Sequence, residues 1–379
     1  MKKTKIKFNS LSFVLSCLVI FIVLFGVLMV YSASFYSAKR NYNNQYFFLT
    51  KQVIGFVLGF AGMIVFSKID YNKLKKFSRI FFLLSLVLLL LVFVPGLGVE
   101  NYGARRWIAL PGFTIQPSEI AKFAFVLYAS SYLSKNYDKI KTLKGILPVL
   151  LCGGVTCLLV ILEPNMSITI CIGAVLMTML FLGGLSKKHF LMLLVPALLF
   201  VPVLVIIEPY RMARLVAFVN PWANPKGEGY QLIQSFFSIG NGGLFGVGLF
   251  NSRQKYLFLP FCESDFIFSV IAEEFGLFGS VAVVLLFFFV CYLGYKIAIH
   301  AKDRFGCYLA SGITSIIAIQ SILNFCVVTG LIPPTGLPLP FISSGSTSLV
   351  VFMSAIGVVL NINKQSNNLN FVNYSKSRV

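Results

Sequence analysis

The sequence predicts an all-α integral membrane protein with about ten transmembrane helices. Of its 379 residues, 58% are hydrophobic and only 12% are charged, and the mean hydropathy is +0.86, far outside the composition of an ordinary soluble domain. Apolar runs near or above the ~18 residues needed to cross a bilayer recur along the chain. Because these runs do not alternate apolar and polar residues, they predict helices and not a transmembrane barrel.

The positions of the apolar runs give the expected spans in order. They are residues 11–34, 52–67, 79–97, 118–134, 145–162, 166–184, 189–207, 266–299, 306–330 and 347–363. The first run is too long, and too weakly followed by small residues, for a cleaved signal peptide. Since no linker rich in Pro, Gly or Ser interrupts the runs, residues 1–363 are predicted to form one membrane domain. The polar residues 364–379 are expected to be a disordered cytoplasmic tail.

The distribution of positive charge predicts the orientation of the spans. An even number of spans places both termini on the same side, and the terminal segments together with the loops on that side carry 21 of the 32 Lys and Arg residues. By the positive-inside rule, both termini are therefore cytoplasmic. The net charge of +20 is explained by attraction to the anionic inner leaflet, so no nucleic-acid partner is expected.

Two long segments between spans are expected on the outer face. Residues 98–117 form the first, and residues 208–265, between the seventh and eighth spans, form the large extracytoplasmic loop. Long ordered loops usually carry function. Of the 12 acidic residues only Asp70, Asp138 and Asp303 fall in cytoplasmic segments, which also indicates chemistry at the outer face.

The cysteines and histidines predict neither a disulfide framework nor a zinc site. The eight cysteines contain no Cys-x-x-Cys pair, and most lie inside apolar runs, where cysteine serves as a small core residue. The two histidines, His189 and His300, are isolated near expected cytoplasmic helix ends. The sequence therefore leaves the identity of any metal undetermined.

The motif "QPSEIAK" places charge at the start of the fourth span. Glu119 and Lys122 are three residues apart and share one helix face, where a paired charge entering the bilayer usually marks a functional cavity. Capping alone could also explain the motif, because Pro and Glu are both favoured in the first helical turn. Just upstream, Arg105 and Arg106 make this outer segment cationic, which suits an anionic lipid headgroup.

The second outer segment adds further cations and a glycine-rich stretch. Arg211, Arg214 and Lys255 are its candidate ligands for an anionic substrate. The glycines of "GNGGLFGVG" permit close backbone approach to a ligand, but they match no phosphate-binding consensus.

The segment "LPFCESDFIFSVIAEEFG" places acidic residues before and inside an apolar run. Asp265 directly precedes the run, so it could cap that helix or act as a general base at the membrane surface; composition leaves both roles open. Glu263 lies two residues earlier. Glu273 and Glu274, about two turns into the run, are expected to support the structure by bonding to neighbouring helices.

Five segments carry a resemblance to the SEDS family (shape, elongation, division and sporulation), and most of all to its division branch. They are "VYSASFYSA", "GARRWI…QPSEIAK", "VNPWANPKGEGYQLIQSFFSIGNGGLFGVGL", "SRQKYLFLPFCESDFIFSVIAEEFGLFG" and "TGLPLPFISSGSTSL". The resemblance implies a peptidoglycan glycosyltransferase that polymerises lipid II at the outer face of the bacterial cytoplasmic membrane. It also implies a class B penicillin-binding protein and other division proteins as partners at the septum.

The resemblance also assigns residues. It implies that Asp265 is catalytic and that Glu119 and Lys122 belong to the substrate site, and it is compatible with a divalent cation, Mg²⁺ or Mn²⁺. The further candidates are the substrate-binding cations Arg105, Arg106, Arg211, Arg214 and Lys255 and the accessory acids Glu263 and Glu274. The chain departs from the family pattern at Phe261, Asn165 and Ser344.

Two alternative functions stay open at this stage. A lipid II flippase would show repeat symmetry, broken helices in mid-membrane and buried charge along a path through the bilayer. The other alternative is a non-catalytic scaffold for the crosslinking enzyme, which the sequence does not distinguish from an enzyme.

Overall fold

A computed structural model describes residues 10–101, 104–110 and 113–376. Each of the ten expected spans overlaps a helix of this part of the chain. These helices are α1 (Ser10–Tyr42), α2 (Phe47–Lys68), α3 (Tyr71–Leu91), α4 (Pro117–Lys135), α5 (Leu143–Leu162), α6 (Met166–Leu182), α7 (Lys187–Ile207), α10 (Ile267–Ile299), α11 (Arg304–Val328) and α12 (Ser346–Lys376).

Seven of the described helices are long and apolar enough to cross a membrane: α1, α2, α5, α7, α10, α11 and α12. The apolar helix α6 is shorter, and α4 carries Glu119 and Lys122 in its first turns. Helix α3 is displaced from the expected span 79–97, because the side chain of Asp70 accepts a hydrogen bond from the amide of Asn72 and so starts the helix at Tyr71. The chain is therefore mostly helical and multi-pass in character.

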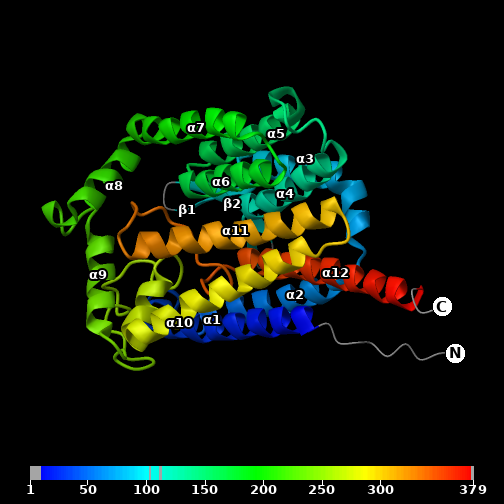
Figure 1. The fold of residues 1–379 in the computed structure, drawn as a ribbon. Helices are drawn as coiled ribbons and strands as arrows, with labels where there is room; N and C mark the ends of the chain where they lie inside the picture. The colour runs from blue at the N-terminus through cyan, green and yellow to red at the C-terminus, as the bar shows by residue number, and fades with distance from the viewer. Residues whose placement is uncertain (1–9, 102–103, 111–112, 377–379) are drawn as a thin grey trace.

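The helices form one elongated bundle. Helix α12 packs along α2, and α11 packs along both α10 and α4, so α11 and α12 are the most buried spans. In contrast, none of the residues of α7, all of them described, is buried. Figure 1 shows that α1 begins and α12 ends at the same end of the bundle, whereas α8, α9 and the start of α10 lie at the opposite end.

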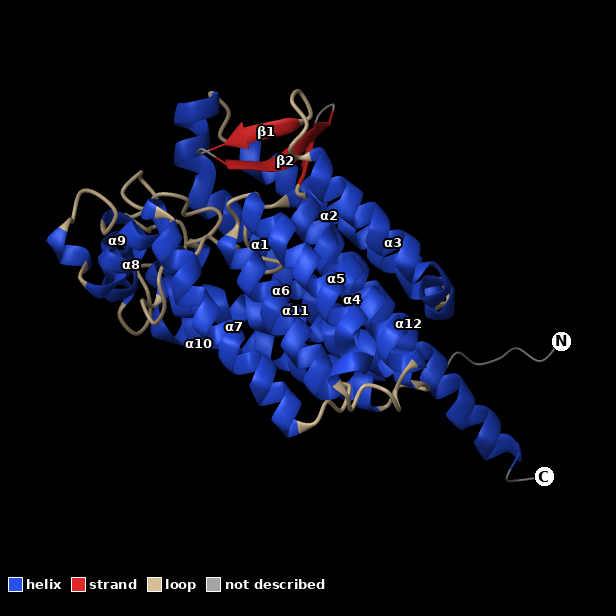
Figure 2. Cartoon of the chain, turned by 90° about the horizontal axis from the view of Figure 1, so that it is seen from above, coloured by secondary structure: helices blue, strands red, loops and turns tan. Residues whose placement is uncertain are grey.

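The first outer segment folds into a small antiparallel sheet that the sequence analysis did not predict. Its strands β1 (Gly98–Asn101), β2 (Ala104–Leu110) and β3 (Phe113–Ile115) pair in the order β1-β2-β3, with Ile108 opposite Ile115. Figure 2 shows the strands at the margin of the helical bundle. Because side chains alternate along a strand, Arg105 is exposed while Arg106 is half-buried.

The large segment between α7 and α10 contains two amphipathic helices and a short turn. Helix α8 spans Pro209–Val219, the 3₁₀ helix η1 spans Pro221–Ala223, and α9 spans Tyr230–Gly242. The residues between α9 and α10 are irregular. This segment forms most of the end of the bundle at which α10 begins.

Helix α10 is broken at Gly276, whose φ of 67° and ψ of −162° are not helical. Only glycine adopts this conformation readily. The amides and carbonyls around the break bond to the chain after α9: the amide of Leu277 donates to Gly243 O at 2.9 Å, and the amide of Val247 donates to Glu273 O at 2.9 Å. The helix break is therefore stabilised by hydrogen bonds between its backbone polar groups and the chain after α9.

Helix α12 continues beyond residue 363, into the segment for which the sequence predicts a disordered tail. Gln365 Nε2 donates to Asp70 Oδ1 at 2.8 Å, and Ser366 Oγ accepts from the amide of Lys302 at 3.0 Å. These two contacts fix at least one more helical turn against α3 and the start of α11. The boundary of the folded domain therefore lies after residue 363.

Candidate functional site

Asp265 lies at the junction between the irregular segment and α10, and its backbone is held from two sides. Asn324 Nδ2, from α11, donates to Asp265 O at 2.8 Å and to Leu337 O at 2.7 Å. Ser343 Oγ donates to Ser264 O at 2.6 Å. A buried amide and a buried hydroxyl therefore bind the Asp265 segment to α11 and to the loop between α11 and α12.

The helix-capping role for Asp265, which the sequence left open, is wrong. The N-cap of α10 is Phe266, and no side-chain hydrogen bond caps the helix there. The carboxylate instead faces Gly336, where an added Cβ would lie 3.2 Å from Asp265 Oδ2. Gly336 has a φ of +76°, so the position requires glycine both for its backbone and for the space beside the carboxylate.

Three charged groups act on the Asp265 carboxylate. Burial raises the pKa of Asp265 to about 6, an effect that Glu263 reinforces and that the guanidinium groups of Arg214 and Arg106 oppose. A carboxylate with a pKa near 6 is ionised at neutral pH and basic enough to accept a proton from a hydroxyl. Asp265 is also half-buried and not closed off from solvent, as a group that meets a substrate must be.

Arg106 and Arg214 are held by backbone carbonyls. Arg106 donates from Nε to Glu163 O at 3.2 Å and from an Nη atom to Pro164 O. Arg214 Nη1 donates to Pro334 O at 3.2 Å, and its guanidinium lies 4.5 Å from the ring centroid of Tyr210. Carbonyls do not neutralise the two charges, so both remain available to an anionic ligand.

The other predicted arginines are placed differently. Arg211 Nη1 donates to Leu204 O at 2.9 Å, which directs its guanidinium toward the end of α7. Arg105 is exposed on β2. The fold therefore brings Arg106 and Arg214 to Asp265, and it gives Arg105 and Arg211 positions on other surfaces.

Glu119 and Lys122 form the predicted pair, with 2.9 Å between Lys122 Nζ and Glu119 Oε1. Lys122 also donates to Gln320 Oε1, and Ser348 Oγ donates to Glu119 Oε2 at 2.9 Å. The side chain of Lys122 is 1% exposed and that of Glu119 is 0% exposed. The pair is thus confirmed as a contact, but it joins α4, α11 and α12 in the interior and does not line an open cavity.

Lys255 is an interior residue in this structure. Its side chain is 0% exposed, and Nζ lies 2.9 Å from Glu274 Oε1. A substrate would reach this ammonium only after a change of structure, so the predicted binding role of Lys255 has no support from the geometry. Glu263 is half-buried, and its carboxylate accepts a bond from Cys262 Sγ at 3.5 Å; burial raises its pKa.

The sequence analysis missed several residues of this region. Gln320 and Asn324 are polar residues four apart in an apolar span, and this spacing on one helix face was a usable signal. Gly336 gave no signal, because its need for a positive φ is set by tertiary contacts. Glu163 is fully buried, neither of its carboxylate oxygens has a hydrogen-bond partner, and burial raises its pKa to about 8 against the opposing effect of Arg106.

A cavity of about 190 Å³ lies beside the Asp265 region, with which it shares Arg214 and Pro334. Phe261, one of the departures from the family pattern, contributes an aromatic side chain to its wall. The full lining is Arg214, Gly227, Glu228, Tyr230, Gln231, Pro260, Phe261 and Pro334. Among the described residues, no group of three or more His, Cys, Asp or Glu side chains could hold a metal ion.

The fold and this site define a multi-pass helical membrane protein with a carboxylate at one end of the bundle on which the charges of two arginines act. The family model described as cell cycle protein, of the FtsW, RodA and SpoVE type, matches residues 12–368. The chain belongs to this family, which confirms the resemblance to SEDS proteins.

Two curated relatives illustrate the similarity. A probable peptidoglycan glycosyltransferase FtsW from Geobacter metallireducens is 41% identical over 339 residues, which is 89% of this chain and 90% of the relative. Stage V sporulation protein E from Bacillus subtilis is 38% identical over 343 residues, covering 90% and 93% of the two chains. The chain thus spans nearly the whole length of both relatives.

Solved structures support the same fold. A chain from a peptidoglycan synthase complex that coordinates polymerization and crosslinking superposes with a TM-score of 0.77 at 27% identity, covering 93% of this chain and 98% of the other. The rod shape determining protein RodA of Thermus thermophilus gives a TM-score of 0.70 at 24% identity, covering 93% and 96%.

Proposed function

We propose that the chain is a peptidoglycan glycosyltransferase that polymerises lipid II into glycan strands at the outer face of the cytoplasmic membrane during cell division. The observation that carries the proposal is the Asp265 carboxylate, half-buried, with a pKa of about 6 and acted on by Arg106 and Arg214. The names of the relatives, probable peptidoglycan glycosyltransferase FtsW above all, support the same reaction.

In the proposed mechanism, the 4-hydroxyl of the acceptor sugar attacks the anomeric carbon of the lipid-linked donor. The new bond forms between that oxygen and the anomeric carbon, while the bond to undecaprenyl pyrophosphate breaks with inversion. Asp265 takes the hydroxyl proton, and the leaving group keeps the electron pair. Arg106 and Arg214 lie where the developing negative charge of the pyrophosphate would be stabilised in the transition state.

The proposal includes a divalent cation as an optional group of the site. Mg²⁺ commonly binds one or two carboxylates and completes its coordination with substrate phosphates and water. Asp265 and Glu263 are the carboxylates that would hold it, and when bound it would supply charge stabilisation to the pyrophosphate.

The proposed topology has ten spans, two cytoplasmic termini and an outer site. Helix α1 begins and α12 ends at the same end of the bundle (Figure 1), which supports this topology. The start of α10, next to Asp265, lies at the opposite end. The excess of Lys and Arg at the first of these ends supports its cytoplasmic location. The proposal includes the bacterial inner membrane, the septum and a class B penicillin-binding protein with other division proteins as partners.

One structural feature favours a flippase as the second candidate. A broken helix such as α10 is common in transporters. However, the backbone groups at the break are bonded by residues 243–248 and do not line an open path, and the nearby Glu274 is fully buried and paired with Lys255. The polymerase therefore accounts for more of the structure.

The test is to incubate the purified protein with labelled lipid II, alone and with its crosslinking partner. We expect polymer from the unmodified protein and none from Asp265→Asn at equal membrane abundance. Movement of labelled lipid II across vesicles without polymer would instead support the flippase. Polymer that forms only when the partner is present, and that Asp265→Asn leaves undiminished, would instead support the scaffold.

A further inference from the structure

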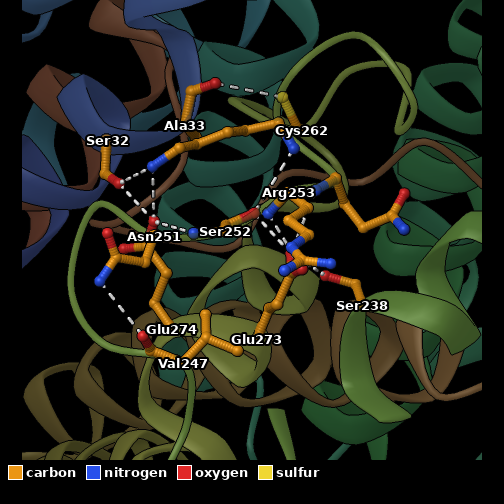
Figure 3. A network of polar contacts seen from close by, with 12 residues as sticks. Ser32, Ala33, Ser238, Val247, Asn251, Ser252, Arg253, Cys262, Glu273 and Glu274 are labelled. Carbon is orange, nitrogen blue, oxygen red and sulfur yellow. Dashed lines mark hydrogen bonds and ion pairs between the residues drawn. The ribbon is translucent and has the colours of Figure 1, made fainter. Parts of the chain in front are cut away.

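The segment between α9 and α10 is docked by two adjacent glutamates that the proposed mechanism does not use. We call residues 249–262 the strap; it leads directly to Asp265. Glu273 and Glu274 are neighbours on α10, so their side chains point about 100° apart around the helix. Figure 3 shows both carboxylates directed from α10 toward the strap residues Ser252 and Arg253.

Glu273 accepts bonds from four donors. These are the amides of Arg253 at 3.0 Å and Gln254 at 3.4 Å, the hydroxyl of Ser252, and the hydroxyl of Ser238 from α9 at 3.2 Å. Glu273 is fully buried. A buried carboxylate needs this many donors in place of water, so the strap is bonded where the charge requires it.

Glu274 joins the strap to α1. Its Oε1 accepts from Lys255 Nζ at 2.9 Å and from the hydroxyl of Ser32 at 2.7 Å, and all three side chains are fully buried. The Lys255 ammonium also lies 5.2 Å from the ring centroid of Phe35. The end of the strap makes a second contact with α1: Cys262 Sγ donates a hydrogen bond to the backbone carbonyl of Ala33 at 3.3 Å.

The strap would not hold this shape alone. Three strap residues have positive φ values: 64° for Phe250, 71° for Leu257 and 55° for Phe261. This left-handed region is disfavoured for residues other than glycine. Such strain persists only where surrounding contacts over-determine the backbone. The side chains of Phe250 and Phe258 are exposed. Aromatic contacts with α1 add to the polar ones: the ring centroid of Tyr256 lies 5.9 Å from that of Phe35, and the ring centroid of Phe250 lies 6.0 Å from that of Tyr31.

We propose that Glu273 and Glu274 are positioning residues that dock the strap on α10 and α1 and thereby set the place of Asp265, three residues beyond Cys262. Neither glutamate touches the substrate; both act through the strap. The inference rests on the proposed function for its effect on the reaction. The docking itself can be measured without any substrate.

Cys262 can report docking, because the residue is 3% exposed and its thiol donates a hydrogen bond to Ala33 O of α1. The experiment measures alkylation of Cys262 by N-ethylmaleimide in membranes containing the full chain, quantified by mass spectrometry of its peptide. Glu273→Gln removes the negative charge and so weakens the hydrogen bonds that this side chain accepts. We expect Cys262 to be alkylated about 10- to 100-fold faster than in the unmodified protein. Ser238→Ala, a milder change, should accelerate it a few-fold.

The ion pair between Lys255 and Glu274 allows a second test, in which a single variant and a double variant should have opposite effects on the alkylation of Cys262. Lys255→Met leaves Glu274 buried without its cation and should accelerate labelling strongly, whereas Lys255→Met with Glu274→Gln should restore much of the protection. The matched control is Asp303→Asn, a carboxylate-to-amide change in a hydrogen-bonded position at the other end of the bundle. It should leave Cys262 protected.

The reaction gives the third readout. Measured over a range of lipid II concentrations, Glu273→Gln should lower kcat with little change in KM. Unchanged Cys262 protection in Glu273→Gln and Ser238→Ala, at normal protein abundance, would overturn the inference. If the unmodified protein made no polymer, the proposed function would fail, while the labelling result would still decide the docking.

Discussion

The pH dependence of polymerisation is the sharpest consequence of the site. A general base must be ionised before it can accept a proton, and the pKa of Asp265 is about 6. The ionised fraction is then about 90% at pH 7 and about 10% at pH 5, so the rate should fall about tenfold between these values. An aspartate with its usual pKa near 4 would lose almost no activity over the same range.

Removing neighbouring charges should shift the acid limb of the pH–rate profile, in opposite directions for Glu263 and Arg214. Glu263 raises the pKa of Asp265, so Glu263→Gln should shift the acid limb to lower pH and preserve more activity at pH 5. Arg214 lowers that pKa, so Arg214→Gln should shift the limb to higher pH, in addition to slowing the reaction through loss of charge stabilisation. Asp265→Asn should lose about 10²–10⁴ in rate, roughly 3–5 kcal/mol of the barrier.

The assay is the conversion of labelled lipid II to polymer by purified protein, at saturating substrate and matched abundance, from pH 5 to pH 8. Asp265→Asn should insert and fold normally, because Asp265 does not cap α10. A rate that is flat across this range, or near-normal polymer from Asp265→Asn, would refute the reasoning. If Glu263→Gln alone abolished polymer at every pH, the base would be Glu263.

Three further predictions follow from the fold. Removing one charge of the interior pair, as Glu119→Gln or Lys122→Met, should destabilise the protein by about 3–5 kcal/mol, and the double variant should lose less than the sum; additive melting shifts at normal abundance would contradict the pairing. Gly336→Ala should lower polymer yield at least tenfold, because a side chain there is strained and meets the catalytic carboxylate at 3.2 Å; wild-type kinetics would show that the contact is unimportant. A reporter fused after Val379 should read cytoplasmic and one inserted near Gly227 extracytoplasmic; the same reading from both would exclude the ten-span topology.

The sequence by itself determined where the long apolar helices lie and which family the chain belongs to. Helix-forming apolar runs are local features, so a helix lies at each run, in α1 to α7 and α10 to α12. The start of α3 and the ends of α1 and α12 nevertheless differ from the predicted bounds by eight residues or more. The contact between Glu119 and Lys122 was equally predictable, since residues three apart share one face of any helix. The early start of α3 comes from a single capping contact, the hydrogen bond from the amide of Asn72 to the side chain of Asp70.

Only the tertiary structure decided which charges meet at the site. Arg106 and Arg214 come from β2 and α8, far apart in sequence, and no local pattern separates them from Arg105 and Arg211. In the sequence Lys255 is one more outer cation, but the fold pairs it with a glutamate of α10 in the interior. Burial and long-range pairing depend on how the whole chain packs, and together they set the pKa of Asp265, the proposed general base.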